Sequence, residues 1–484
     1  MLDNSEGHTH KTMKVAFHTL GCKVNHYETE AIKEAFVSRG AEIVNEEDFA
    51  DVYVINTCTV TNIADRKSRQ FIRRAKKVNP DALVAVTGCY AQVASDEVAD
   101  MPEVDLVVGN GRKSEICGLV MKKLSDRDCG RPGADDDLRD RDGDGTGDCR
   151  SGAETLVYPR ADLNYYEDMG KVTSAGEGMI RAYLKIQDGC DRFCSYCLIP
   201  YARGPVRSRP KDEIIEELEG MLANGFREIV LTGINTALYG TEDGADCSLS
   251  ELLTAIDEMP CPDGGDFRIR LSSLEPTVVD KDNVEKVIRH RRLCHHLHLS
   301  VQSGSSSVLK AMNRHYSRED YLDIVNAIRE YDPLFGLTTD IIVGFPGETE
   351  EDFAESADIV RQAQFGKTHV FRYSPRRGTA GAAMKDAVPE PVKKERGAVL
   401  ESTGEETAAN FIQANRGIAH TVLIEEFADG YATGYTGNYI KVYIRLCDAC
   451  GLDAWVRPGR FVQAKITEPF RDGALAELAQ VSNE

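Results

Sequence analysis

The stretch AYLKIQDGCDRFCSYC, residues 182–197, decides the fold of the larger part of this chain. Its first half is a short apolar run that predicts a buried strand, and its second half carries Cys190, Cys194 and Cys197 in the spacing C-x3-C-x2-C. A loop this short brings three thiolates to one side, where they can bind three corners of one iron–sulfur cluster. Such clusters normally have four cysteine ligands, so one iron would stay open for a small molecule. A zinc site is the alternative, but it would require a fourth ligand nearby.

Apolar runs alternate with helical patterns about six times from this strand onward, which predicts a partial (β/α) barrel over residues 178–412. The cysteine loop then lies at the carboxyl ends of the strands, where barrels of this class carry their active sites. Residues 413–478 differ, because short strands broken by Gly-rich turns predict a small all-β barrel. The sequence thus predicts an α/β protein with a separate β-barrel after the α/β domains.

Residues 13–125 predict a further domain, in which short apolar strands alternate with helices as in a doubly wound parallel sheet. Cys22, Cys58 and Cys89 each follow an apolar run, in TLGC, INTC and VTGC. Since the carboxyl ends of neighbouring parallel strands meet at one edge of a sheet, three cysteines in this position converge in space. One cysteine at a strand end is usually a small buried side chain, but three in register predict a second three-thiolate cluster site.

The remaining cysteines form no comparable pattern. Four isolated ones are interpreted as small buried side chains: Cys117, Cys247, Cys261 and Cys294. Cys447 and Cys450 have the C-x-x-C spacing of a metal site, but no second pair follows them. His296 and His298 alternate within a predicted strand and are interpreted as core or barrel-wall residues.

Residues 126–177 lack apolar periodicity and are rich in Asp, Gly, Arg and Ser, which predicts an interdomain linker enlarged by a disordered insertion. Within it, residues 140–148 space their carboxylates as in a calcium loop, but the closing Glu of an EF-hand is missing. A flexible acidic loop is the preferred interpretation.

The net charge of −21 disfavours a nucleic-acid partner, because phosphate contacts depend on Lys and Arg. The charge is uneven, however: seven Asp fall within residues 135–148, whereas basic residues gather within 66–77 and 203–211. Those basic clusters are either solvated faces or RNA contacts. No secretory signal is present and no apolar stretch approaches the ~20 residues of a membrane helix. We therefore expect a cytoplasmic monomer without a membrane partner. Of its fourteen cysteines, we expect those that form a pattern to bind metal or clusters rather than to form disulfides.

The sequence DGCDRFCSYC resembles the radical S-adenosylmethionine signature, with Tyr196 at the usual aromatic position before the third cysteine. Together with the strand-end cysteines and the terminal β-barrel, it makes residues 13–469 similar to the methylthiotransferases. The three domains look like that family's N-terminal cluster domain, radical barrel and RNA-binding TRAM domain. The stretches LGCKVNHYETE, NTCTVTNIADRKSRQ, TGCYAQ and IPYARGPVRSR look like the branch that modifies threonylcarbamoyladenosine beside the tRNA anticodon.

The resemblance implies two 4Fe-4S clusters and S-adenosylmethionine as cofactors, tRNA as substrate and a low-potential electron donor. The open iron of the barrel cluster would bind S-adenosylmethionine, whose cleavage would give a radical that removes hydrogen from C2 of adenine. The cluster on the strand-end cysteines would hold the sulfur that is donated to that carbon. Seven residues are implied for S-adenosylmethionine: Tyr196 in the cysteine loop and, at the strand ends, Thr232, Gly233, Asn235, Ser273, Glu275 and Gln302. Those implied for RNA are Arg73, Arg203, Arg207 and Lys441, with Tyr435 and Tyr439 as further candidates.

Other branches of the family act on isopentenyladenosine in tRNA or on a ribosomal protein, and both substrates stay open as alternatives. A non-catalytic RNA-binding protein stabilised by metal would be an alternative of another class. The three-plus-three arrangement of cysteines argues against it, because structural zinc sites close with four ligands.

Overall fold

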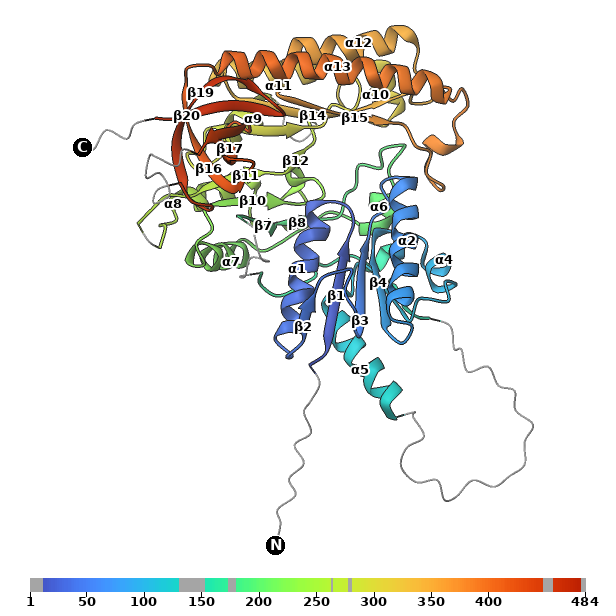
Figure 1. Ribbon diagram of the computed structural model, residues 1–484. Helices are drawn as coiled ribbons and strands as arrows, with labels where there is room; N and C mark the ends of the chain where they lie inside the picture. Colours follow the sequence, from blue (N-terminus) through green and yellow to red (C-terminus); the bar gives the residue numbers. More distant parts are fainter. Residues whose placement is uncertain are drawn as a thin grey trace, which may run out of the picture. The chain divides into compact units, whose positions relative to one another are not determined.

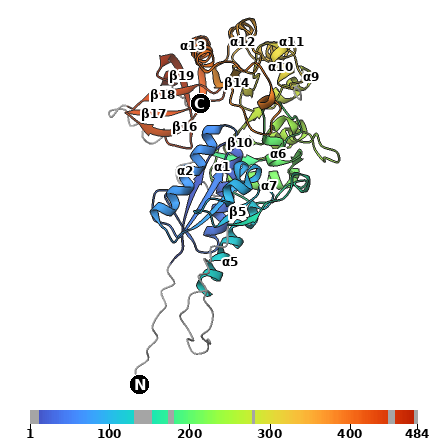
Figure 2. The same ribbon diagram turned by 90° about the vertical axis from the view of Figure 1, so that its right-hand side faces the viewer.

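The structure, a computed structural model, divides the chain into two compact units (Figures 1 and 2). Unit 1 contains the residues up to Lys171 together with Tyr201–Arg203, and unit 2 contains the rest. The calcium-like stretch 140–148 and three cysteines, Cys149, Cys447 and Cys450, lie outside the described residues. The described residues are 12–129, 153–172, 180–262, 264–276, 281–446 and 456–479.

Unit 1 is built on one sheet of six parallel strands in the order β2-β1-β3-β4-β5-β6. The strands are β1 (Lys14–Thr19), β2 (Glu42–Val44), β3 (Val52–Thr57), β4 (Leu83–Gly88), β5 (Leu106–Val108) and β6 (Glu154–Leu156). The helices are α1 (Lys23–Val37), α2 (Asn62–Val78), α3 (Cys89–Val93), α4 (Ser95–Ala99) and α5 (Ile116–Cys129), with 3-10 turns at Lys113–Glu115 and Arg160–Asp162.

Helices cover both faces of this sheet (Figure 1), because the central strands are apolar on both sides. Helices α1 and α5 bury Phe36 and Ile116 against one face, and α2 to α4 bury Ile72 and Val98 against the other. The prediction of a doubly wound sheet is confirmed. Strand β6 pairs with β5 although it falls within the predicted linker 126–177, so unit 1 extends into that interval.

Unit 2 begins with a partial barrel of parallel strands. They form two sheets, β11-β10-β7 and β12-β13-β14-β15, with β11 and β12 separated only by Ser272. The strands are β7 (Arg181–Lys185), β10 (Glu228–Thr232), β11 (Arg268–Leu271), β12 (Ser273–Leu274), β13 (His296–Leu299), β14 (Gly336–Val343) and β15 (Lys367–Arg372). A short antiparallel pair, β8 (Gln187–Asp188) and β9 (Arg207–Ser208), closes the base of the cysteine loop.

The barrel helices follow their strands as the alternating pattern predicts. They are α7 (Lys211–Ala223), α8 (Leu249–Glu258), α9 (Lys281–Ile288), α10 (Ser306–Ala311), α11 (Arg318–Tyr331), α12 (Glu350–Ala363) and α13 (Glu390–Ala414), with 3-10 turns at Thr236–Leu238 and Gly381–Ala383. A short helix between β8 and β9, α6 (Ile199–Arg203), contributes Tyr201–Arg203 to unit 1. Capping boxes fix the starts of α8, α11 and α12, through Ser248, Ser317 and Thr349. Among the described residues, no helix combines the length and the apolar character required to cross a bilayer.

The last part of unit 2 is a closed five-stranded barrel in the order β16-β17-β18-β20-β19. The strands are β16 (Ala419–Ala428), β17 (Tyr431–Thr436), β18 (Lys441–Arg445), β19 (Phe461–Phe470) and β20 (Gly473–Leu478). The predicted all-β barrel is confirmed. Strand β20 is hard to predict from sequence, because GALAEL lacks the β-branched and aromatic residues that mark strands.

Buried arginines dock this barrel against the amino ends of the (β/α) strands. Glu228, the first residue of β10, is fully buried and accepts hydrogen bonds from Arg268 Nε at 2.6 Å and Arg270 Nε at 2.9 Å. Arg268 also donates to the Tyr435 carbonyl at 2.8 Å, and Arg270 donates to the carbonyls of residues 436–437 at 3.2 Å. Backbone oxygens of the small barrel thus complete the hydrogen bonding of cations that a single carboxylate holds in place.

Substitution of Glu228 tests this docking. Burial opposes ionisation of Glu228, but the charges of Arg270, Arg268 and Arg181 lower its pKa to about 2. We expect Glu228→Gln to lower the free energy of unfolding at pH 7 by roughly 3–5 kcal/mol, because buried arginines lose their carboxylate. Since the folded pKa is depressed, this stabilisation is present above the unfolded pKa of about 4.3 and is lost as the pH falls toward 2.

Differential scanning calorimetry between pH 7 and pH 3 measures this effect. Glu406→Gln, a substitution at an exposed position on α13, is the matched control and should change stability by no more than about 0.5 kcal/mol. Equal melting temperatures for the two variants would contradict the docking role of Glu228.

Candidate functional site

The three strand-end cysteines of unit 1 lie at one edge of the sheet. Cys22 follows β1 as the N-cap of α1, Cys58 follows β3, and Cys89 opens α3 directly after β4. Strands β1, β3 and β4 are neighbours in parallel register, so their carboxyl ends adjoin. The chain order reverses between β1 and β3, and ligands of open α/β sheets bind outside the carboxyl ends at such a switch point.

Backbone geometry holds these three turns close together. Gly21 has a φ of +111°, and a Cβ added there would lie 2.9 Å from Cys58 Cβ and 3.0 Å from Cys58 Sγ. Gly88 has a φ of +97°, and a Cβ there would lie 2.2 Å from the carbonyl oxygen of Thr57. Any side chain at either position would therefore push the cysteine turns apart.

Burial keeps Cys58 a neutral thiol when no metal is bound. It raises the Cys58 pKa to about 12, and the nearby thiols of Cys89 and Cys22 act in the same direction. Metal ligation requires the thiolate, so loading of this site must release protons.

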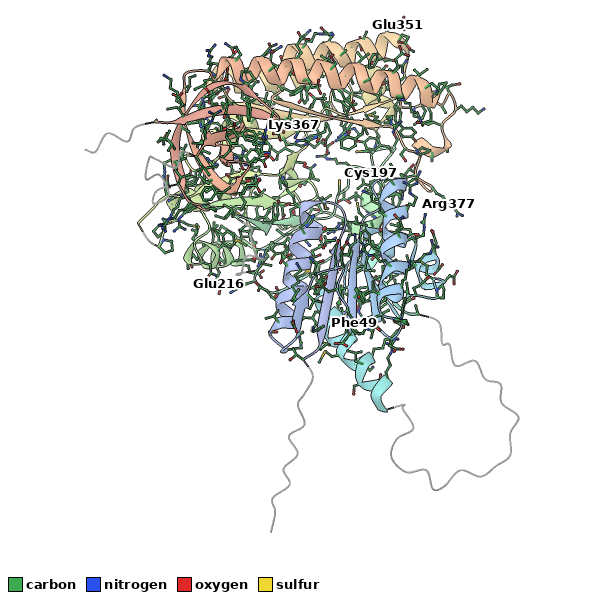
Figure 3. All side chains as sticks on the ribbon, viewed as in Figure 1. Phe49, Cys197, Glu216, Glu351, Lys367 and Arg377 are labelled. Carbon is green, nitrogen blue, oxygen red and sulfur yellow. The ribbon has the colours of Figure 1, made fainter. Side chains whose placement is uncertain are left out.

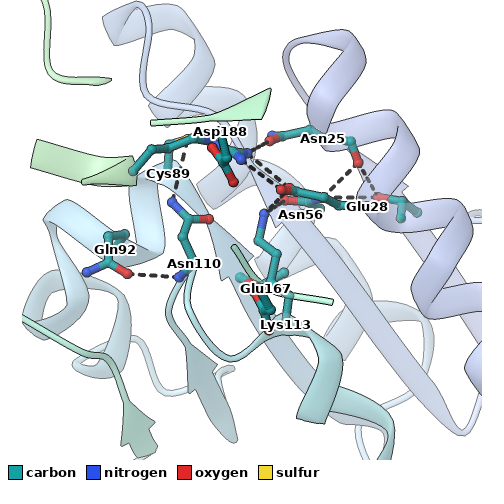
Figure 4. Close-up of polar contacts among 12 residues, drawn as sticks. Asn25, Glu28, Asn56, Cys89, Gln92, Asn110, Lys113, Glu167 and Asp188 are labelled. Carbon is teal, nitrogen blue, oxygen red and sulfur yellow. Dashed lines mark hydrogen bonds and ion pairs between the residues drawn. The ribbon is translucent and has the colours of Figure 1, made fainter. Parts of the chain in front are cut away.

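A buried polar network lies beneath the same three turns (Figure 4). Asn25 Nδ2 donates to the carbonyls of Leu20, at 2.7 Å, and Thr57, at 3.0 Å, which immediately precede the turns of Cys22 and Cys58. The guanidinium of Arg203 donates to both carboxylate oxygens of Glu28, at 2.7 and 3.0 Å. Arg203 was predicted to contact RNA, and this prediction is wrong because its side chain is fully buried in this network.

The network continues on the far side of Glu28. Lys113 Nζ donates to Glu28, and both side chains are almost completely buried. Asn56 Nδ2 donates to the Asn25 carbonyl at 3.0 Å, and Asn110 Nδ2 donates to the Ala202 carbonyl at 2.7 Å. No sequence motif predicts these partners, because they come from four separate segments of the chain.

The second triad lies in the loop between β8 and β9. The amide of Ser195 donates to the Met312 carbonyl and its hydroxyl to the Ala311 carbonyl, both at 2.9 Å. Asn313 Nδ2 donates to the carbonyls of residues 192–193 at 3.1 Å. The end of α10 therefore fixes the loop that carries Cys197. Figure 3 labels Cys197, and it also labels Lys367 at the amino end of β15.

The thiols of this second triad are half-buried and close enough to influence one another electrostatically. Burial raises the pKa of Cys190 and of Cys197 to about 12, and the neighbouring Cys194 acts in the same direction on both. As at the first triad, the metal-free thiols are protonated at neutral pH and a metal must displace their protons.

Four polar side chains form a connected group beside this triad. Glu275 accepts from Asn235 Nδ2 at 3.0 Å and forms an ion pair with Arg314 at 2.7 Å. Arg314 also donates to the hydroxyl of Tyr196 at 2.9 Å. The structure thus brings the predicted residues Tyr196, Asn235 and Glu275 together. Arg314, which connects them, was missed because it lies in a loop after α10 without a recognisable motif.

The other residues predicted for S-adenosylmethionine are less connected. The Thr232 hydroxyl is buried at the end of β10 without a hydrogen-bond partner, so it is available to a bound molecule. Gly233 leaves room for Gln187, whose Oε1 would lie 2.7 Å from an added Cβ. Ser273 is exposed on β12, and Gln302 is buried with a φ of +65° after β13.

A polar layer lines one face of the barrel strands. The registers His298↔Thr338 and Asp340↔His369 put these four side chains on the same face of β13, β14 and β15. The alternate residues, such as Leu297 and Leu299, are fully buried, as expected on the helix-covered outside. The polar, half-buried face is therefore the interior of the barrel.

Asp340 is the centre of this layer. Its Oδ2 accepts from His298 Nε2 and from Ser300 Oγ, both at 3.1 Å. Burial raises the Asp340 pKa, but the hydrogen bonds from His298 and Ser300 and the charge of His369 lower it below its usual value. His298 was predicted to be a core or barrel-wall residue, and it lies on the wall. His296 is buried and stacks on Tyr439 with ring centroids 4.4 Å apart.

The residues predicted to bind RNA are divided between core and surface. Arg207 is buried and lies 3.5 Å from Asp188, so its prediction as an RNA contact is wrong for the same reason as that of Arg203. Arg73 is exposed on α2. Lys441 pairs with Asp472 at 3.1 Å on the C-terminal barrel.

Tyr435 and Tyr439, the aromatic candidates for RNA contact, belong to the docking interface instead. They stack on each other at 5.0 Å, and Arg181 and Arg270 lie over their rings. A different aromatic group of this barrel lies beneath an exposed cation, because Arg471 lies over the rings of Tyr431, Tyr443 and Phe470.

Among the described residues, no group of three or more His, Cys, Asp or Glu side chains is arranged to hold a metal ion. The thiols of each triad influence one another electrostatically. Three open thiols suit a cluster, whose iron atoms occupy separate corners, better than zinc, which requires four converging ligands.

Comparison with known proteins identifies both parts of the chain. Residues 14–109 match the uncharacterized protein family UPF0004, and residues 184–360 match the radical SAM superfamily. A radical S-adenosylmethionine methyltransferase from Kitasatospora setae, TsrM, has a similar fold, with a TM-score of 0.53 at 15% identity over 74% of this chain and 73% of that one.

Three relatives align with nearly the whole chain. The threonylcarbamoyladenosine tRNA methylthiotransferase MtaB of Bacillus subtilis is 39% identical over 96% of this chain and 97% of its own length. The protein of the same name from Aquifex aeolicus is 38% identical over 89% and 100%. The tRNA-2-methylthio-N(6)-dimethylallyladenosine synthase of Carboxydothermus hydrogenoformans is 34% identical over 84% and 87%. With two cysteine triads and these relatives, the chain belongs to the radical S-adenosylmethionine methylthiotransferase family.

Proposed function

We propose that this protein adds a 2-methylthio group to N6-threonylcarbamoyladenosine beside the anticodon of tRNA. The observation that carries the proposal is the similarity over most of the chain to relatives named for that reaction, which exceeds the similarity to the dimethylallyladenosine synthase. The reaction would take place in the cytoplasm and would require a low-potential electron donor.

Each cysteine triad would hold one 4Fe-4S cluster. The donor sets fit, because each offers three free thiols, which can bind three irons of a cluster and leave the fourth open. The cluster at Cys190, Cys194 and Cys197 with S-adenosylmethionine would supply a carbon-centred radical, and the other cluster would supply the sulfur.

The residues around the barrel triad would orient S-adenosylmethionine. Its amino and carboxylate groups need partners of opposite charge, and the ion pair of Glu275 with Arg314 offers one of each sign. The unpartnered hydroxyl of Thr232 gives a further hydrogen-bonding group at the same ends of the strands. Tyr196 would stay a neutral phenol, because burial raises its pKa well above the usual value.

The polar interior of the barrel favours a polar substituent on the adenine. Threonylcarbamoyl carries a carboxylate, a hydroxyl and amide groups, whereas dimethylallyl is a hydrocarbon. If the barrel enclosed a hydrocarbon, the polar side chains of His298, Ser300 and Asp340 would lose their hydrogen bonds to water, and the substrate would offer none in return. For this reason we favour the threonylcarbamoyl substrate over isopentenyladenosine.

The C-terminal barrel and α2 would contact the RNA. Lys441 and Arg471 lie among the aromatic rings of Tyr431 and Tyr443, a combination of cations and aromatics that suits single-stranded nucleic acid. Arg73 on α2 is exposed and would contact phosphate. The alternative of a non-catalytic metal-stabilised RNA-binding protein does not account for the Thr232, Glu275 and Arg314 group beside the second triad.

Nucleoside mass spectrometry of tRNA from cells with and without the gene tests the proposed reaction. We expect the 2-methylthio form of threonylcarbamoyladenosine to disappear in the deletion strain and the unmodified threonylcarbamoyladenosine to accumulate. Restoring the gene should return the modification, whereas a gene that encodes Cys197→Ala should not. Loss of a different methylthio nucleoside would contradict the substrate, and unchanged tRNA would contradict the reaction and direct attention to a ribosomal protein.

Substitution of His298 tests whether the barrel interior contacts the substrate. We expect His298→Leu to lower kcat/KM for methylthiolation of tRNA roughly ten- to a hundredfold, because about 1–3 kcal/mol is lost when a buried polar partner is removed. Cleavage of S-adenosylmethionine without tRNA should stay at the parent rate. His290→Leu is the matched control, since His290 also pairs with an aspartate, Asp257 at 3.0 Å, outside the barrel interior.

The two His298 readouts separate the possible outcomes. Equal loss of tRNA modification and of S-adenosylmethionine cleavage would contradict a substrate contact, and so would parent activity on tRNA.

A further inference from the structure

A buried cation lies directly against the first cysteine triad. Arg203 Nε donates to Cys89 Sγ at 3.4 Å, and the guanidinium is fully enclosed. Asn110 Nδ2 approaches the same sulfur at 3.8 Å. The charge of Arg203 is also close enough to favour the thiolate forms of Cys22 and Cys58. Enclosing a guanidinium is costly unless nearby groups require its charge.

The same guanidinium fixes the backbone of the other two cysteine turns. Arg203 Nη2 donates to Asn25 Oδ1 at 2.6 Å, and Asn25 in turn holds the carbonyls that precede Cys22 and Cys58. Through one direct contact and one intermediate side chain, Arg203 is therefore connected to all three ligand turns.

Glu28 orients Arg203 and opposes its charge. It accepts two hydrogen bonds from the guanidinium, which is the forked geometry that only arginine offers to a carboxylate. Lys113 approaches Glu28 from the other side and holds the carboxylate in place. A positive and a negative group thus lie at fixed positions beside this triad, and the positive group contacts Cys89 Sγ directly.

Hydrogen bonds to cluster sulfur and nearby charges set the reduction potential of an iron–sulfur cluster. One-electron reduction adds a negative charge to the cluster, so a donating cation stabilises the reduced form and a carboxylate destabilises it. We propose that Arg203 is a positioning residue for the cluster on Cys22, Cys58 and Cys89, which holds the ligand turns together and raises the reduction potential of that cluster. This inference rests on the proposed function, in which this triad holds a cluster.

Redox titration of the full-length protein tests the proposal. In a Cys190→Ala/Cys194→Ala/Cys197→Ala background only the first cluster is left, and dithionite supplies one electron per cluster while electron paramagnetic resonance records the reduced form. We expect Arg203→Gln to shift the midpoint potential to lower values, and Glu28→Gln to shift it to higher values. The opposite signs separate an electrostatic role from a structural one, because simple loosening of the site would not give them.

Controls keep the outcome decisive. Arg73→Gln removes an exposed positive charge from the same unit and should leave the potential unchanged. If Arg203→Gln loses its iron, Glu28→Gln and the charge-conserving Arg203→Lys carry the test, and Arg203→Lys should keep a potential nearer to the parent than to any neutral variant. No shift in Glu28→Gln, or shifts of the same sign in both neutral variants, would overturn the proposal. Absence of iron from the background protein itself would overturn the proposed cluster, which is a separate result.

Discussion

Parallel pairing of neighbouring strands determines where chemistry can take place in this protein. Because β1, β3 and β4 run side by side in the same direction, the residues that follow them must adjoin, however far apart they are in sequence. Cysteines at these three positions become a site without any local motif. The same constraint acts in unit 2, where the loop after β7 and the ends of β10 and β12 contribute Cys190, Asn235 and Glu275 to one region.

Charged residues are buried at both ends of the barrel strands, with different consequences. At the amino ends, Glu228 and its arginines meet backbone carbonyls of the C-terminal barrel and are satisfied within the protein. At the carboxyl ends, the Thr232 hydroxyl is buried without a partner and Arg314 and Glu275 lie beside three cysteines. Fully satisfied groups stabilise a fold, whereas groups that await a partner indicate a binding site. The distribution of hydrogen bonds therefore separates the docking end of the barrel from its functional end.

Sequence periodicity and spacing were sufficient for the fold class and for both cysteine triads, because these features depend on local patterns and on the rule of strand ends. Burial could not be predicted for individual arginines. Arg203 and Arg207 lie in a run of basic residues that is indistinguishable in sequence from an RNA-binding segment, yet both are buried in ion pairs. Arg314 and Lys113 were missed because their partners Glu275 and Glu28 are many residues away and no spacing connects them. Strand β6 has only three residues and lies directly after the acidic insertion. The polar composition of residues 126–177 predicted a linker there, so this strand was missed.

The proposed chemistry depends on two separate cysteine triads that each hold a four-iron cluster. Iron and acid-labile sulfide should be counted per chain after anaerobic reconstitution of the parent protein, of Cys22→Ala/Cys58→Ala/Cys89→Ala and of Cys190→Ala/Cys194→Ala/Cys197→Ala. We expect about eight iron atoms in the parent and about four in each triple variant, because each triad binds its cluster independently. A triple variant that keeps the iron content of the parent, or a parent that binds zinc in place of iron and sulfide, would contradict it.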